Sequence, residues 1–204
     1  MIPAFTFEFP TIIEFGVGKA SEIMKAVERE KADKVVLVTD PVLASIGMLD
    51  PIRKILEENG IAYTVYQDIR QNPLSSQVDA CGKLCAEFGA KLIIAVGGGS
   101  VIDTAKAIAY GLAEPEKDVW ELYEHTRTAR KCLPVASILT IAAAGSETSN
   151  SSVITRVDTH QKRAYNDDIS RPKFALMDPE LTKTLPDYQT ESGCADIMMH
   201  TMER

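Results

Sequence analysis

The fold of this chain is decided by the stretch Leu92-Ile93-Ile94-Ala95-Val96-Gly97-Gly98-Gly99-Ser100-Val101-Ile102-Asp103-Thr104-Ala105-Lys106. Its first five residues are apolar and three glycines follow, a pattern that predicts a strand buried on both faces and then a sharp turn. Val101, Ala105, Ile108 and Leu112 then recur at the spacing of a helix's buried face. A strand, a glycine turn and a helix N-terminus together direct N–H groups and a positive dipole end at one point, which suits a phosphate.

Pattern alone leaves the role of this turn open. The dinucleotide fingerprint G-x-G-x-x-G fails because Ile102 stands at its third glycine position, and no Gly-Lys-Ser/Thr follows to make a P-loop. A tight structural turn is therefore the alternative to a phosphate site. Ser100 and Asp103 have a structural alternative as well, as a helix N-cap and its partner three residues on.

Strand and helix patterns alternate along the first half of the chain. Apolar strands are expected at 35–40 and 62–66, and helices that end at Gly60 and Gly89 follow them. This alternation predicts an α/β fold with a parallel, doubly wound, Rossmann-like sheet. Ligands of such sheets bind beyond the carboxyl ends of the strands, where Asp40, Asn72 and the glycine turn are expected.

The flanking segments add smaller elements. Phe5–Glu8 and Thr11–Phe15, on either side of Pro10, predict an N-terminal β-hairpin. Residues 113–131 have the composition of a polar excursion that carries the only tryptophan. Further strands are expected at 134–140, 152–157 and 173–177.

Composition bounds the class of protein. With 45% hydrophobic and 25% charged residues, the 204-residue chain can bury one good core. A net charge of −7 argues against nucleic acid as the main partner. No signal peptide or membrane span is expected, and four cysteines without a C-x-x-C pair indicate reduced thiols, so a cytoplasmic location is expected.

The glycine motif, Gly97-Gly98-Gly99-Ser100-x-x-Asp103-x-Ala105-Lys106, resembles that of the iron-containing (group III) alcohol dehydrogenases, although Val101 stands where the family usually has proline. The resemblance implies that the turn holds the pyrophosphate of a nicotinamide dinucleotide. It also implies that Asp103 lies beside the nicotinamide.

Further motifs at 10–19, 140–147 and 178–186 also resemble the family. The resemblance implies that Thr140 begins a second cofactor loop, in which Ile141 replaces a usual threonine, and that Leu181 and Thr182 line the cofactor cleft. Lys162 matches a lysine that reaches the nicotinamide ribose, although a lone lysine in a polar stretch is also typical of a solvated surface. The residues expected to bind the cofactor are Asp40, Asn72, Gly97, Gly98, Gly99, Ser100, Asp103, Thr140, Lys162, Leu181 and Thr182.

The last segment carries a candidate metal pair. Asp196 and His200 are four residues apart on an expected helix, so they share a face, and both are apt ligands for a divalent transition metal. Such a pair is also typical of a plain surface contact. The resemblance favours a metal, iron or zinc, because the family's ligands begin with Asp-x-x-x-His and continue with two histidines from a second, helical domain. Residues 1–185 are therefore expected to be a dinucleotide-binding domain, and 186–204 the first helix of a truncated metal-binding domain, in the N-terminal part of a longer enzyme.

The segment from Leu133 onward most resembles the butanol dehydrogenase and aldehyde reductase branch. This implies hydride transfer between NAD(H) and a primary alcohol or aldehyde such as butanol or butanal, although no side chain is predicted as a proton-transfer base. A homodimer is a further expectation. The alternatives are a polyol-phosphate dehydrogenase, a 3-dehydroquinate synthase, and a non-catalytic nucleotide-binding module.

Asp40 bears on the choice between NAD and NADP. A carboxylate beyond a strand end can accept hydrogen bonds from ribose hydroxyls and repel the extra phosphate of NADP. The sequence therefore predicts a preference for NAD. The structural alternative is that Asp40, followed by Pro41, only begins a turn.

Overall fold

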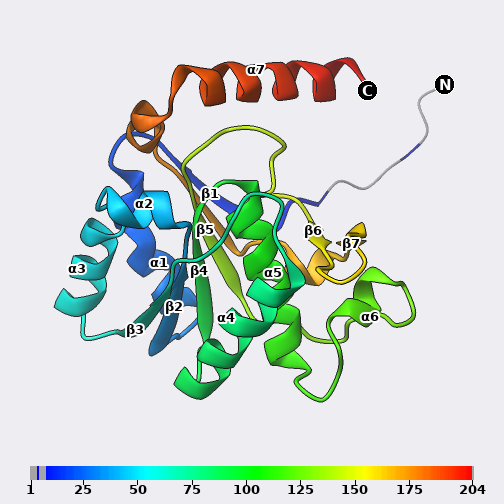
Figure 1. Ribbon diagram of the computed structural model, residues 1–204. Helices are drawn as coiled ribbons and strands as arrows, with labels where there is room; N and C mark the ends of the chain where they lie inside the picture. The colour runs from blue at the N-terminus through cyan, green and yellow to red at the C-terminus, as the bar shows by residue number, and fades with distance from the viewer. Residues whose placement is uncertain (1–3, 5–7, 204) are drawn as a thin grey trace.

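A computed structural model describes residues 4 and 8–203 of the chain, and its core is a six-stranded sheet of order β1-β8-β5-β4-β2-β3 (Figure 1). All of its neighbouring strands run parallel. The strands are β1 (Ile12–Phe15), β2 (Lys34–Val38), β3 (Ala62–Tyr66), β4 (Leu92–Gly97), β5 (Val135–Leu139) and β8 (Phe174–Met177). The parallel, doubly wound α/β fold predicted from the sequence is confirmed.

Helices cover both faces of this sheet. The α-helices are α1 (Met24–Arg29), α2 (Pro41–Ser45), α3 (Asp50–Glu58), α4 (Ser75–Phe88), α5 (Gly99–Ala113), α6 (Trp120–Tyr123) and α7 (Asp187–Met202), and the 3₁₀ helices are η1 (Lys19–Ile23), η2 (Asp168–Ser170) and η3 (Pro179–Thr184). Ile93 and Ala95 of β4 pack in the same cluster as α4 and α5, whereas Ile94 and Val96 pack in the cluster that contains α1 and α3. Because both faces of β4 are buried, its sequence is apolar at every position.

The N-terminal strand finds a different neighbour from the one expected. Ile12–Phe15 forms β1 and pairs with β8 in parallel at the edge of the sheet. The other half of the predicted hairpin, Phe5–Glu8, lies outside the described residues except for Glu8, which is not in a strand. An antiparallel pair does occur later, between β6 (Ser151–Thr155) and β7 (Lys162–Asn166). The residues of β7 are mostly polar, so their pattern does not predict a strand.

The segment 113–131 is not a mere polar excursion, which corrects the sequence-based expectation. Trp120 and Tyr123 are buried, and their rings stack with centroids 5.5 Å apart. The Tyr123 hydroxyl lies 2.7 Å from Oγ of Ser152 on β6. The two aromatic side chains of this charged segment therefore complete the core beneath the β6–β7 hairpin.

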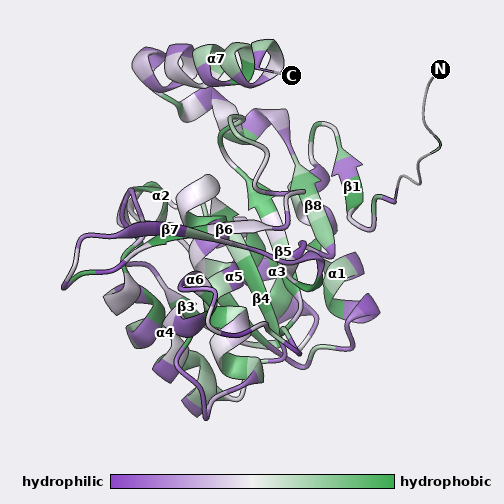
Figure 2. Cartoon of the chain, turned by 90° about the vertical axis from the view of Figure 1, so that its right-hand side faces the viewer, coloured by the Kyte–Doolittle hydropathy of each residue, from purple (hydrophilic) through white to green (hydrophobic). Residues whose placement is uncertain are grey.

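The last helix, α7, stands apart from the sheet, at the top of Figure 1. Gly193 is its only buried residue. Hydrophilic and hydrophobic residues are mixed along it (Figure 2), and the large side chains of Tyr188, Met198 and Met202 are exposed. Within residues 4 and 8–203, no helix has the length and apolar character that crossing a membrane requires.

Candidate functional site

The glycine turn lies at the carboxyl end of β4 and leads directly into α5. Gly98 is the N-cap of α5, and no side chain caps this end. The first N–H groups of the helix therefore face the end of the sheet, where they can bind an anion. Ser100 lies inside the first turn, and the carboxylate of Asp103 binds elsewhere, so the capping alternative for this pair is wrong.

The turn needs glycine because other chain segments approach it closely. A Cβ atom on Gly97 would lie 2.6 Å from Cγ2 of Val101, and one on Gly98 would lie 2.6 Å from Cγ2 of Ile141. Ile141 belongs to the segment between β5 and β6, residues 140–150, which we call the second loop. The glycine turn and the second loop therefore pack against each other with no room for a side chain between them.

The second loop also contacts α7. Its first residue, Thr140, donates its backbone N–H to the carbonyl of Gly97 at 3.2 Å. Further on, the carbonyl oxygen of Ala142 lies so near Gly193 that a Cβ there would be 2.7 Å away. The second loop is thus placed between the glycine turn and α7, as Figure 1 shows.

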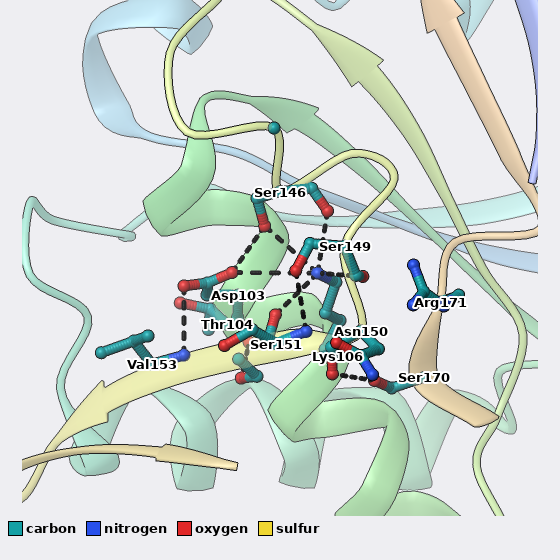
Figure 3. Close-up of polar contacts among 12 residues, drawn as sticks. Asp103, Thr104, Lys106, Ser146, Ser149, Asn150, Ser151, Val153, Ser170 and Arg171 are labelled. Carbon is teal, nitrogen blue, oxygen red and sulfur yellow. Dashed lines mark hydrogen bonds and ion pairs between the residues drawn. The ribbon is translucent and has the colours of Figure 1, made fainter. Parts of the chain in front are cut away.

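Asp103 projects from α5 toward the second loop (Figure 3). Its Oδ1 accepts a hydrogen bond from Oγ of Ser146 at 2.6 Å, and its Oδ2 accepts one from the N–H of Val153 at 3.1 Å. Burial raises the pKa of the Asp103 carboxyl above its usual range. The Ser146 hydrogen bond and the charges of Lys106 and Lys162 act in the opposite direction.

Lys106, which is not among the residues expected to bind the cofactor, is completely buried behind this carboxylate. Its Nζ donates to the carbonyl oxygens of Ser146, Ser149 and Ser151 at 2.8, 2.9 and 2.8 Å. Burial lowers the pKa of Lys106 to about 8, although the nearby carboxylates of Asp103 and Glu147 raise it. The available signal was a lysine inside the apolar run 105–109.

Two expected cofactor residues from distant parts of the chain meet each other. Nζ of Lys162, at the start of β7, donates to Oδ1 of Asn72 at 2.8 Å. Asn72 has a φ of 54°, a left-handed conformation that asparagine tolerates. Lys162 is also close enough for its charge to act on Asp103.

Asp40 has the structural role that the sequence left open. It is the N-cap of α2, and its Oδ1 accepts hydrogen bonds from the N–H groups of Val42 and Leu43, both at 2.9 Å. Leu181 and Thr182 lie on η3, just after β8. Leu181 packs on the core, and the Thr182 hydroxyl donates to the carbonyl of Pro179 at 2.8 Å.

Asp196 and His200 lie on the same side of α7, with Oδ1 and Nε2 3.7 Å apart. Asp196 lines a cavity of about 380 Å³ together with Ile141 and Ala143 of the second loop and Gly193 of α7. In the described part of the chain, no group of three potential metal-binding side chains is present. The pair fits a metal by donor chemistry but supplies fewer than the usual three protein ligands of a catalytic site.

The packing at Gly98 predicts that alanine substitutions at Gly98 and Gly82 change the stability of the chain in opposite directions. Gly98→Ala should destabilise the chain by about 1–3 kcal/mol, because the new methyl group displaces Ile141. Gly82→Ala, on α4 with open space around it, should stabilise by about 0.5–1 kcal/mol. Urea unfolding measures both, and Ile141→Ala should recover part of the Gly98→Ala loss. Equal stability of the two alanine variants would contradict this packing.

The pKa of Lys106 predicts a pH-dependent stability. Folded Lys106 loses its proton near pH 8, whereas the unfolded chain keeps it up to about 10.5. Between these values the unfolded state binds more protons, so a rise in pH favours the folded state, by on the order of 3 kcal/mol across the window. The difference in unfolding free energy between the wild type and Lys106→Met should therefore grow as pH rises. The exposed Lys54→Met is the control, and a difference that stays constant or shrinks would contradict the prediction.

Comparisons with known proteins agree with this geometry. The family model for iron-containing alcohol dehydrogenases matches residues 10–179. NADH-dependent butanol dehydrogenase A of Clostridium acetobutylicum is 36% identical over 200 residues, which cover 98% of this chain and 51% of that protein. NADPH-dependent aldehyde reductase YqhD of Escherichia coli is 32% identical over a match that covers 98% of this chain and 51% of that protein.

A solved structure gives the same result for the fold. NADH-dependent butanol dehydrogenase A from Thermotoga maritima has a TM-score of 0.93 and 31% identity, over 98% of this chain and 50% of that one. The chain thus spans about half the length of the relatives it matches. With the family model matched over most of its length, the chain belongs to the iron-containing alcohol dehydrogenases.

Proposed function

We propose that this chain is the nucleotide-binding part of a metal-dependent alcohol dehydrogenase or aldehyde reductase that uses NAD(H). One observation carries the proposal: α5 has an uncapped N-terminus within the run of three glycines, and Asp103, one turn further on, is near enough to Lys162 to feel its charge. The family membership and the names of its relatives support the same activity. The substrate we propose is a primary alcohol or its aldehyde, of which butanol and butanal are examples.

The chain's own residues would bind and orient the dinucleotide. The N–H groups at the start of α5 face the position proposed for the pyrophosphate. Lys162 and Asn72, already joined by a hydrogen bond, would bind the nicotinamide ribose, and Asp103 would lie beside the nicotinamide. The bound nicotinamide supplies the hydride chemistry. Thr140, Leu181 and Thr182 would line the remaining part of the cleft.

Asp196 and His200 would hold a divalent ion, iron or zinc, which supplies Lewis-acid polarisation of the substrate oxygen. The cavity supports this placement, because Asp196 lines it together with Ile141, the residue of the second loop that packs on the glycine turn. We further propose that residues 186–204 begin a second, helical domain after the dinucleotide-binding domain of 1–185. The exposed apolar side chains of α7 support this boundary. A homodimer in the cytoplasm completes the proposal.

Cofactor preference tests the role of Asp40. If Oδ2 of Asp40 accepts hydrogen bonds from the adenosine ribose hydroxyls, the extra phosphate of NADPH lies next to a second negative charge. At roughly 4 Å and an effective dielectric of about 20, this repulsion costs on the order of 4 kcal/mol. Solvent reduces this cost, so we expect the wild type to prefer NADH by about tenfold or more. Asp40→Ser should lower the preference, because serine keeps the α2 cap without the charge.

Calorimetric titration with NADH and NADPH measures this preference. Ser45→Ala, which changes a hydroxyl at the other end of α2, is the control. Equal affinity of the wild type for both cofactors, or an unchanged ratio in Asp40→Ser, would remove Asp40 from cofactor selection. If neither cofactor binds the wild type, the nucleotide-binding proposal itself fails.

Metal binding tests the α7 pair. Two protein ligands should hold Zn²⁺ weakly, so dialysis of this chain against a chelator should remove all of it. His200→Ala should weaken the residual binding by about tenfold, whereas His160→Asn, an exposed change away from the pair, should not alter it. Stoichiometric zinc kept after dialysis would contradict a half-site.

Binding of NADH without turnover of butanol or butanal is the expected result for this chain. A non-catalytic nucleotide-binding module would give the same result.

A further inference from the structure

The ammonium group of Lys106 is unusual because its partners are backbone carbonyls rather than a carboxylate. The nearest carboxylate oxygen, Oδ1 of Asp103, is 4.0 Å away, and the lysine side chain has no exposed surface. Three carbonyl oxygens, from Ser146, Ser149 and Ser151, receive its N–H groups. An ammonium has three N–H donors, so two carbonyls of the second loop and the carbonyl of Ser151, the first residue of β6, satisfy all of them.

This arrangement fixes a segment that has no regular secondary structure. From Ile141 to Asn150 the chain is neither helix nor strand, so it has no continuous ladder of backbone hydrogen bonds to fix its conformation. Lys106 gathers the end of this segment around one cation, as Figure 3 shows. Arg171 adds a second hold through the carbonyl of Thr148, at 2.7 Å. The conformation of the second loop therefore depends on two basic side chains beneath it.

Ser146 links this cation to Asp103. Its Oγ lies 3.2 Å from Nζ of Lys106 and donates to Oδ1 of Asp103 at 2.6 Å. The other carboxylate oxygen accepts from Val153, just beyond Ser151, the last residue held by Lys106. Both oxygens of Asp103 are thus held by the backbone or side chains of a segment that Lys106 anchors.

We propose that Lys106 is a positioning residue, which holds the second loop against the glycine turn and thereby fixes the orientation of the Asp103 carboxylate. The inference rests on the proposed function, in which this turn and this carboxylate bind NAD(H). Lys106 itself touches no ligand, since it is buried beneath the loop. It acts through Ser146 and the loop backbone.

The experiment compares Lys106→Met and Ser146→Ala with the exposed control Lys54→Met. Methionine fills the space of lysine but removes the hydrogen bond that Lys106 donates to each of the three carbonyls. Hydrogen–deuterium exchange of the unliganded chain is read on peptides that cover 141–153, with β2 as the internal reference. We expect exchange in 141–153 to quicken by about tenfold in Lys106→Met while β2 is unchanged, and Kd for NADH to rise by about tenfold.

Ser146→Ala is a second variant, which tests the proposal even if Lys106→Met does not fold. It breaks the link to Asp103 but leaves the three carbonyl contacts, so the Val153 amide should exchange faster and Kd for NADH should rise by about threefold. Unchanged loop exchange in a folded Lys106→Met, or no change of either quantity in Ser146→Ala, would overturn the proposal. Faster exchange throughout the chain, β2 included, would show a merely structural role.

The two parts of the experiment keep the two proposals separate. If the wild type does not bind NADH, the proposed function fails, while the exchange data still decide whether Lys106 orders the loop. If the loop loosens in Lys106→Met but NADH affinity stays the same, the role in cofactor binding is wrong.

Discussion

The close packing of the Val101 and Ile141 side chains on the glycine backbone at the carboxyl end of β4 is the constraint on which the rest of the site depends. No Cβ fits at Gly97 or Gly98, because Val101 and Ile141 occupy the space that it would need. The missing side chains let α5 start immediately after the strand and let the second loop lie on the turn. No side chain caps the helix N-terminus, which lies at the carboxyl end of the strands, where parallel sheets bind their ligands.

Much of the fold could be predicted because strands that are buried on both faces of the sheet have continuous runs of apolar residues. β4 is apolar throughout and β2 is apolar from Val35 onward, and glycine ends the helices α3 and α4 in a left-handed conformation. β7 has no such run, since it pairs only with β6 and keeps polar residues. Trp120 and Tyr123 lie in a charged segment, so their burial follows from tertiary packing that periodicity does not encode.

The site was predicted unevenly for the same reason. The glycine turn is local in sequence, and its residues could be identified as a group. The second-loop and β6 partners of Asp103 and Lys106 lie 40 or more positions away in the sequence, so only the fold brings them together. Asp40 shows a further limit: a carboxylate that caps a helix and one that binds a ribose have the same neighbours in sequence. The structure establishes the cap and leaves one oxygen, Oδ2, for the proposed ligand.

The contact at Gly193 explains why α7, although exposed, has a defined orientation. Its approach to the Ala142 carbonyl requires a residue without a side chain, so this side of the helix faces the second loop. Asp196 and His200 follow Gly193 at steps of three and four residues, which places all three on one face of the helix. The face that touches the loop is therefore the face that carries the proposed metal ligands, and Asp196 lines the cavity between them. A loop anchored by Lys106 would in this way set the separation of the glycine turn from the metal pair, since the same short segment contacts both.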